Sequence, residues 1–348
     1  MNWWQKFRRN RLAQLGAAIL VLMYLVAIGA GFVAPYGPYE TQANGSLLPP
    51  TTVYWRHQET GEWLGPHVYP TAQGPVELET GNRQVTVDFS EPSPIRLFTR
   101  DAQERLHLFG TAGPGRLNLL GTDEQARDQF SRLLHGSRIS LSVGLVGIAI
   151  SFPIGMLVGG LAGYFGGAVD AVLMRLVEVI MTIPSIYLLV ALAAVLPPGL
   201  GSAQRFMLIV LITSFIGWAG LARVIRGQVL SIKERDFVQA SKVMGGRSFY
   251  IVVRHILPQT ATYGIIAATL AVPGFILAEA VLSFIGLGIQ QPDASWGNML
   301  SLATNASILV LQPWLVWPPA VLIVITSLAF NLLGDGLRDA LDPRTLKQ

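Results

Sequence analysis

Cysteine is absent from the 348 residues, and charged residues make up only 13% of them. The first absence excludes disulfides, thiolate metal sites and a cysteine nucleophile, although it does not fix the redox compartment. The second is unusual, because soluble domains normally carry about 25% charged residues. Half of the residues are hydrophobic, and they fall in long blocks with few charges. The composition therefore predicts a chain that lies in a lipid bilayer.

The short motifs that mark common catalytic sites are also missing. There is no G-x-x-x-x-G-K-[ST] phosphate loop, so the chain itself is not expected to hydrolyse ATP. H-E-x-x-H and G-x-S-x-G are absent as well. Three of the five histidines, His57, His67 and His107, share one polar region. There we favour ordinary solvated histidines over a metal site. We expect no catalytic residue, no metal and no cofactor bound by this chain.

Six apolar blocks are long enough to cross a bilayer as helices, which takes about 20 residues. The first, Leu12–Ala34, is uncharged and follows a basic start. We favour an uncleaved span over a cleaved signal peptide, because the block is long and others follow. The others are Ile139–Phe165, Val169–Leu196, Phe206–Ala222, Thr260–Ile285 and Trp314–Leu333. Pro153, Pro184 and Pro273 should kink three of them. The predicted fold is an all-α polytopic membrane protein with six transmembrane helices.

A polar insert at residues 35–134 separates the first two spans. It holds 12 of the 21 acidic residues, and Gln84–Phe89 alternates in polarity as a strand does. We therefore predict an insert with some β structure. The remaining divisions are an N-terminal segment 1–11, the first span 12–34, a five-helix domain 135–338 with a loop at 223–258, and a C-terminal segment 339–348.

Lysine and arginine are distributed unevenly among the short loops. If the N-terminus is cytoplasmic, the inner segments hold most of these residues, including seven in the 223–258 loop. The outer loop Gly286–Pro313 has none, and Pro197–Arg205 has one. This bias predicts that both termini are cytoplasmic and that the insert faces outward. It also explains the formal charge of +4 without a nucleic-acid partner, since no basic face carries stacking aromatic residues.

The loop Arg223–Pro258 contains a predicted short helix at Asp236–Met244. Three residues at helical spacing form an apolar stripe on it: Phe237, Ala240 and Met244. Gly245 and Gly246 end the helix in the usual way, and a second apolar cluster, Phe249–Val253, follows. Such a helix suits a groove on another protein, but it also suits the membrane surface. The physical argument alone leaves both possibilities open.

The spacing in this loop resembles a known signature. Gln239-Ala240-Ser241, three residues, Gly245, nine residues and His255-Ile256-Leu257-Pro258 is similar to the E-A-A-x3-G-x9-I-x-L-P motif of ABC importer permeases. In that family the loop forms a coupling helix that sits in a cleft of a separate ATPase. The resemblance implies these coupling residues: Asp236, Phe237, Gln239, Ala240, Ser241, Met244, Gly245, Leu257 and Pro258. Gln239, Ser241 and His255 depart from the motif, and contacts that need a carboxylate at position 239 are in question.

Further segments, in the same order along the chain, resemble the dipeptide, oligopeptide and nickel permease family. They are Arg9–Leu20, Leu119–Leu141, Gly217–Ser231, Ala278–Gln290, Ser295–Leu300 and Asn331–Arg344. The insert, about Tyr36–Arg116, resembles a subset of members with extended outer loops. The resemblance implies a permease subunit of an ATP-driven importer in a bacterial inner membrane.

The same resemblance implies the partners. They would be a second, related permease, two ATPase subunits that carry ATP and Mg²⁺, and an extracytoplasmic substrate-binding protein, all at a lipid bilayer. The substrate stays open among dipeptides, oligopeptides, nickel and other small solutes.

The spans contain four charged residues, Asp170, Arg175, Glu178 and Glu279, and the last three need an explanation because charge in a bilayer is costly. Arg175 and Glu178 can pair on one helix face, and we favour a structural pair over a gating role. Glu279 either faces the translocation path or bonds between helices. The alternative function is an ion-gradient-driven transporter or channel, which would need a carboxylate relay and an internal repeat. An intramembrane enzyme would need a buried nucleophile and base, yet no histidine lies in a span.

Overall fold

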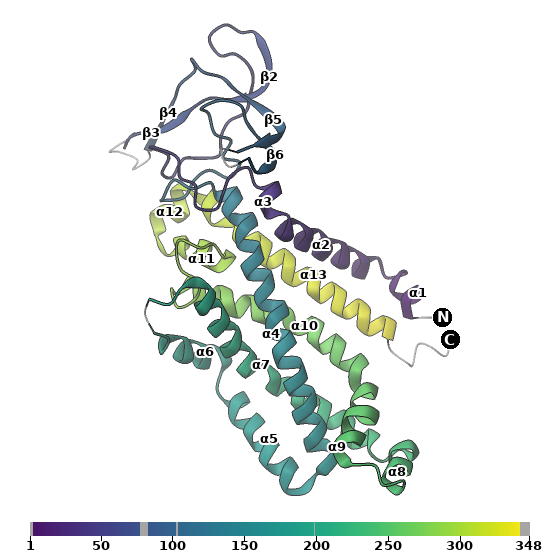
Figure 1. Ribbon diagram of the computed structural model, residues 1–348. Helices are drawn as coiled ribbons and strands as arrows, with labels where there is room; N and C mark the ends of the chain where they lie inside the picture. Colours follow the sequence, from purple (N-terminus) through teal and green to yellow (C-terminus); the bar gives the residue numbers. More distant parts are fainter. Residues whose placement is uncertain (1–2, 77–82, 102–103, 198, 342–348) are drawn as a thin grey trace. The chain divides into compact units, whose positions relative to one another are not determined.

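The computed structural model describes residues 3–76, 83–101, 104–197 and 199–341, and its elements are drawn in Figure 1. The chain divides into two compact units. Unit 1 is drawn from residues 1–21, 141–282 and 324–348, and unit 2 from residues 22–140 and 283–323. Each unit is described by itself below.

The apolar blocks form helices of membrane-crossing length. Among the described residues, five helical segments are long and apolar enough to cross a membrane: Arg11–Ile28 (α2), Gln129–Phe165 (α4), Ser202–Ile232 (α7), Ser248–Phe284 and Pro313–Leu341. The segment at Ser248–Phe284 comprises α9 (Ser248–Tyr250), the π-helix η1 (Ile251–Ile256) and α10 (Leu257–Phe284). The last segment comprises the short η3 (Pro313–Leu315) and α13 (Trp317–Leu341). The predicted polytopic helical fold is confirmed.

The predicted span Val169–Leu196 is divided rather than continuous. It forms α5 (Gly167–Thr182) and α6 (Ser185–Ala194), which meet at 85°. If this pair is one broken span, the described chain has six crossings. The break lies at Pro184, because the preceding Ile183 takes the extended backbone that a following proline favours. By contrast, α4 and α10 run on through Pro153 and Pro273.

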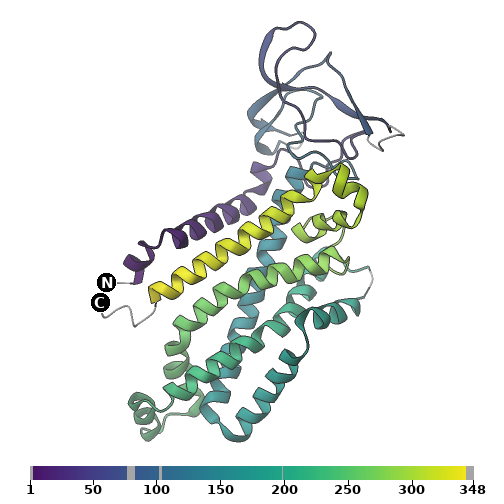
Figure 2. The same ribbon diagram turned by 180° about the vertical axis from the view of Figure 1, so that it is seen from behind.

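Close approach of α4 and α7 organises unit 1. Gly155 and Gly163 of α4 lie so near α7 that an added Cβ would come within 2.9 Å of the carbonyl oxygens of Trp218 and Arg226. Gly159, between them, faces the Ala222 carbonyl in the same way. Small residues allow membrane helices to pack closely, and these glycines do so within this chain. Figures 1 and 2 show α7 and α10 running side by side.

Unit 2 contains the insert, which is partly β as predicted. Four strands pair antiparallel in the order β1-β2-β5-β6, and β3 and β4 form a separate pair. Their bounds are Tyr54–Arg56, Trp63–Val68, Thr71–Val76, Arg83–Val87, Ser93–Arg100 and Leu106–Thr111, for β1 to β6. The expected strand at Gln84–Phe89 corresponds to β4. The first span ends nearby, where α2 is followed after Gly29 by the short α3 (Ala30–Val33).

A buried ion network fixes the outer loop of unit 2. Asp123 pairs with Arg127 at 2.6 Å and with Arg132 at 3.3 Å, and all three side chains are at most 5% exposed. Both arginines also donate to the Gln291 side-chain oxygen, at 2.7 and 3.0 Å. The Pro292 carbonyl accepts from both as well. The network therefore ties the segment before α4 to the loop after α10.

The short elements complete the described chain. They are α1 (Trp3–Phe7), α8 (Asp236–Val243), α11 (Trp296–Leu300), η2 (Ser301–Thr304) and α12 (Ala306–Leu311).

Candidate functional site

The end of α7 carries the predicted loop away from the apolar part of unit 1. A helix of 31 residues is about 46 Å long, at about 1.5 Å per residue, and exceeds a hydrocarbon core of about 30 Å. Near its C-terminal end α7 is joined to α5, because the Arg226 guanidinium donates to both carboxylate oxygens of Asp170. The helix thus continues beyond its uncharged block, and this charged part of α7 is held to α5 by the Arg226–Asp170 pair.

The short helix α8 follows after a brief turn. Asp236 lies in its first turn and Lys242 in its last, so each charge lies at the helix end where the helix dipole stabilises it. The Gln239 side chain donates to the Lys233 carbonyl at 2.9 Å, and this bond joins α8 to the end of α7. A glutamate here, as in the family motif, has no N–H to donate when ionised. The departure at position 239 therefore gives this chain a specific local contact.

A glycine pair stops α8. Gly245 has a left-handed φ of +80°, which suits glycine and strains other residues. The Gly246 N–H donates to the Ser241 carbonyl at 2.9 Å, and the Gly245 N–H to the Lys242 carbonyl at 3.0 Å. These two bonds form a Schellman motif. The predicted helix end at these glycines is thus confirmed, with α8 ending at Val243.

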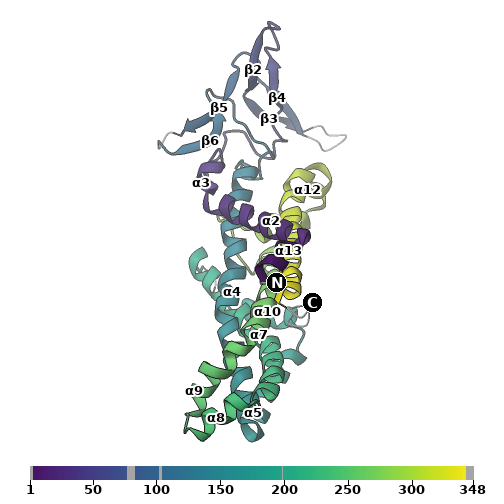
Figure 3. The same cartoon turned by 90° about the vertical axis from the view of Figure 1, so that its right-hand side faces the viewer.

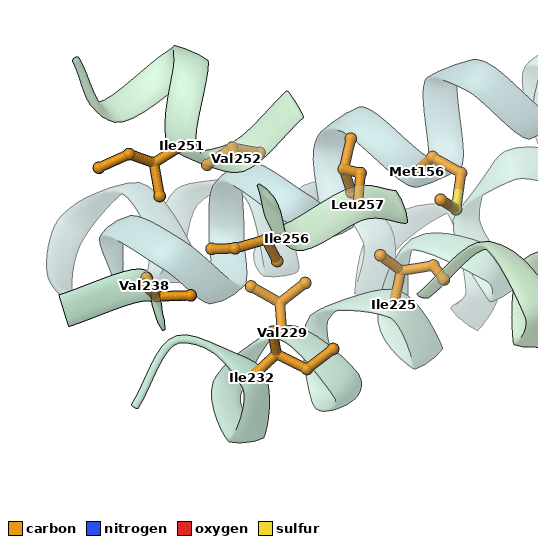
Figure 4. Close-up of a cluster of buried hydrophobic side chains, with 9 residues drawn as sticks. All are labelled: Met156, Ile225, Val229, Ile232, Val238, Ile251, Val252, Ile256 and Leu257. Atoms are coloured by element: carbon orange, nitrogen blue, oxygen red, sulfur yellow. The ribbon is translucent and has the colours of Figure 1, made fainter. Parts of the chain in front are cut away.

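One apolar side chain of α8 points into the protein. Val238 is fully buried in the cluster shown in Figure 4. The other members come from α4, α7, η1 and α10, and they are Met156, Ile225, Val229, Ile232, Ile251, Val252, Ile256 and Leu257. A second contact reaches α4, since the Lys242 ammonium lies 5.2 Å from the centre of the Tyr164 ring. Displacement of α8 is therefore resisted by this shared cluster and by the contact with Tyr164.

The chain enters its next span through a π-helical turn. In η1 the helix is wider than usual, and the Leu257 N–H donates to the Val252 carbonyl five residues earlier. Pro258 follows immediately, has no N–H, and would disturb an ordinary α-helical ladder at this point. The π turn lets the helix continue into α10 without a break, so η1 and α10 lie in one segment.

The opposite face of α8 is apolar and uncovered. Val243 is 88% exposed, Met244 81% and Phe237 40%. Ala240 is exposed beside them. A groove of about 580 Å³ follows, lined by Arg247, Phe249, Tyr250, Val253 and Arg254. Exposed apolar surface of this kind, bordered by basic residues, is typical of interaction sites.

The predicted coupling residues divide into an exposed set and an anchoring set. The exposed set lies on the uncovered side of α8 and comprises Asp236, Phe237, Ala240, Met244 and Gly245. Gln239 is half-buried, and Ser241 and Leu257 are buried. Pro258 is exposed at the start of α10.

The charged residues predicted inside spans lie elsewhere in unit 1. Arg175 and Glu178 form the expected ion pair on α5 at 3.0 Å, with both side chains largely exposed. Glu279 is fully buried in α10. The structure does not bring these three residues to α8, and their roles stay predictions.

Two functional positions escaped the sequence interpretation. Val238 is the anchor of α8, but its inward neighbour at helical spacing is the small polar Ser241, so no apolar stripe marks that face. Val243 is among the most exposed apolar residues, yet it lies outside the stripe predicted from Phe237. Helical spacing would have indicated Val243, which lies three residues after Ala240, but no apolar neighbour at helical spacing marks Val238.

Comparison with known proteins identifies the family. Residues 152–347 match the family described as the binding-protein-dependent transport system inner membrane component. Residues 2–50 match the N-terminal TM domain of oligopeptide transport permease C. The chain belongs to the binding-protein-dependent transport permease family. The permease is therefore a multi-pass membrane protein, and its relatives are non-enzymatic transporter subunits.

Relatives at 34–41% identity carry peptide-transport names. The dipeptide transport system permease protein DppC of Bacillus subtilis is 34% identical over 98% of this chain and 84% of its own length. The oligopeptide transport system permease protein OppC of the same organism is 39% identical over 98% and 88%. The OppC protein of Haemophilus influenzae is 41% identical over 65% and 70%. The two Bacillus alignments extend across the insert, which agrees with a long-loop subset.

The insert histidines bond to nearby protein groups. The His57 ring nitrogen accepts from the Glu59 N–H at 3.1 Å, and the buried His67 lies 3.2 Å from the Tyr69 hydroxyl. Among the described residues, no group of three or more histidines and carboxylates is placed to hold a metal ion.

Proposed function

We propose that this permease forms part of the translocation path of an ATP-driven peptide importer, and that residues 236–258 dock a separate ATPase. The observation that carries this proposal is the two-sided character of α8. Val238 places the helix in a buried cluster to which α4, α7, η1 and α10 also contribute side chains, while Met244 and Val243 are available to a partner. A partner that moves α8 must therefore move the long helices with it.

The mechanism follows from this attachment. Closure of the ATPases would displace α8 as a rigid body, because the Schellman stop and the Gln239 bond hold its two ends. The buried cluster would pass the displacement to α7, and α4 would follow because its glycines lie directly against α7. ATP and Mg²⁺ belong to the ATPases in this proposal, and the permease binds no cofactor.

An open apolar cavity of about 350 Å³ lies between α6, α7 and α10 in unit 1. Ser185 and Thr213 line it among apolar residues that include Phe275. We assign this cavity to the wall of the path. We assign Glu279 to helix packing, because its side chain is fully buried.

The remaining partners and the substrate are proposed from the family. A second, related permease would complete the path, two ATPases would bind the cytoplasmic face, and a substrate-binding protein would deliver solute to the outer face. Both termini would lie in the cytoplasm of a bacterial cell, by the distribution of lysine and arginine. The relatives named above favour dipeptides or oligopeptides over nickel. Membership of this family argues against an ion-gradient-driven transporter.

The docking proposal is tested with Met244→Glu. Its side chain is 81% exposed, so the variant should fold, but a carboxylate would enter an apolar interface without a partner. We expect loss of ATPase co-purification and of peptide uptake by the reconstituted complex. Val310→Glu, at a 74% exposed residue of α12, is the matched control and should retain both. Normal ATPase capture and uptake by the Met244 variant would refute the docking assignment.

A further inference from the structure

The β5–β6 hairpin is attached to the ends of two membrane-crossing helices in unit 2. His107 of β6 donates through Nδ1 to the Ala34 carbonyl, directly after α3, at 2.5 Å. Phe109, two residues further along β6, packs against Phe130 in the first turn of α4, with 6.2 Å between ring centres. Figure 3 shows the hairpin beside α3. One face of the hairpin is therefore turned toward the ends of both spans.

Strand pairing places Leu97 on that same face. Leu97 lies directly opposite Phe109 across the antiparallel pair, and opposite residues project on one side of a sheet. Leu106 belongs to the other face, because it alternates with His107 along β6. Both leucines are exposed, Leu97 by 69% and Leu106 by 45%.

The backbone at Phe98 departs from regular strand geometry, in which its side chain would project on the face opposite to Leu97. Its φ of +55° is left-handed, which is a true outlier for a bulky residue. Its ring stacks on Phe32 of α3 at 6.3 Å, and it stays 61% exposed. Such strain persists only where something else offsets it, and it often marks a functional position. The distortion brings two adjacent large apolar residues, Leu97 and Phe98, toward the span ends.

These side chains continue an apolar stripe of the first span. Leu25, Ile28 and Phe32 follow one another at helical spacing along α2 and α3, and all three are exposed, Ile28 by 75%. On a helix that crosses a membrane, an exposed apolar stripe faces lipid. Phe98 extends this stripe by its stack on Phe32. The lipid-facing surface therefore passes from the helix onto the hairpin.

We propose that Leu97 and Phe98 insert into the bilayer at the boundary between headgroups and acyl chains. The hairpin is then a membrane-surface anchor of the insert, and its occupant is lipid. Phenylalanine and leucine are typical of elements that bury an apolar face at the boundary between headgroups and acyl chains. The β5–β6 pair thereby attaches the insert to the bilayer beside the first span. This attachment is additional to the covalent link between the insert and the spans.

The absence of cysteine makes the test direct, because single-cysteine variants can be labelled at one site. The full-length chain carrying Leu97→Cys or Phe98→Cys is labelled with an environment-sensitive fluorophore and placed in phosphatidylcholine–phosphatidylglycerol nanodiscs. Leu106→Cys, on the other face of the same hairpin, is the matched control. Each sample is quenched separately with lipids that carry a nitroxide on the acyl chain and with aqueous iodide.

We expect several-fold stronger quenching by the nitroxide lipids at positions 97 and 98 than at 106, and the reverse with iodide. All three positions are exposed, so labelling should not unfold the chain, and a single symmetric elution peak verifies this. Iodide quenching at 97 and 98 as strong as at 106 would show that the hairpin lies in water. Protection of both positions from both quenchers would show that protein covers them. Either result overturns the proposal.

Discussion

Two segments of this permease that connect long helices are held in opposite ways. In unit 1, α8 rests on apolar packing around Val238 and on a few backbone bonds. In unit 2, the loop after α10 is held by a buried network of Asp123, two arginines and Gln291. Apolar packing has no preferred direction, whereas charged hydrogen bonds require one geometry. The first suits a segment that meets a moving partner, and the second suits a fixed scaffold.

The largest effect is expected in the buried network. Asp123→Ala removes the only carboxylate paired with both Arg127 and Arg132 in the described structure, and leaves two buried cations. Loss of one partner from a buried pair costs about 3–5 kcal/mol. The thermal midpoint and the membrane yield of the variant should fall sharply.

Glu40→Ala is the matched control for this change. Glu40 is 37% exposed, lies 3.6 Å from both Arg105 and Arg116, and accepts from the Gly37 N–H, so its removal should cost about 1 kcal/mol, less than the loss of Asp123. If the two variants unfold at the same temperature, the contrast between a fixed network and an ordinary surface pair is wrong.

A smaller effect is expected from Asp128, which immediately precedes α4. Burial raises the pKa of this carboxyl to about 6, although its oxygen accepts from the Ser131 N–H at 2.6 Å. The folded state then holds this proton more strongly than the unfolded state does. The free energy of unfolding should therefore fall as the pH rises from about 4 to about 6, by at most about 3 kcal/mol, at 1.36 kcal/mol per unit.

Thermal unfolding at several pH values measures this slope. Asp128→Asn keeps an oxygen acceptor for Ser131 but cannot ionise, so its slope over the same range should be flatter than that of the parent. Equal slopes would place the titrating group elsewhere.

The smallest effect on stability is expected at α8, where the effect on function should be large. Gly245→Ala must hold a Cβ at a φ of +80°, which costs about 1–2 kcal/mol. Nothing lies within 4 Å of the added atom, so strain is the whole cost. Amide hydrogen exchange of α8 should quicken and ATPase capture should weaken, with little change in the thermal midpoint.

Gly245→Asn separates strain from side-chain size, because asparagine tolerates the left-handed region better. It should retain more ATPase capture than alanine does. If alanine lowers the midpoint as much as Asp123→Ala does, α8 is part of the scaffold and the contrast drawn above fails.

Much of this architecture could be predicted from local patterns. Uncharged blocks identify the spans because a bilayer tolerates few charges. Proline alone did not identify the break in the described chain, because Pro153 and Pro273 lie inside continuous helices and only the span at Pro184 is divided. Gly245 and Gly246 identify the end of α8 by backbone preference alone. The family motif identified the segment as a whole.

Contacts between residues far apart in the sequence could not be predicted from such local patterns. Nothing local to Asp123 indicates that Arg132 and Gln291 meet beside it, since that depends on how the chain folds back. The insert strands were missed except at β4, because β1 and β2 include turn-forming and aromatic residues without clean alternation. The distortion at Phe98 likewise arises from a tertiary contact with Phe32.

The brevity of α8 has a consequence for evolution. Eight residues span about 12 Å, at about 1.5 Å each, and only a few side chains project from the uncovered face. If α8 docks the ATPase as proposed, an element this small can change its preferred partner through one or two substitutions, while Val238, Gly245 and Gly246 preserve its shape. Related importers could then use the same ATPase subunit, or come to use different ones, without substitutions in any membrane-crossing helix.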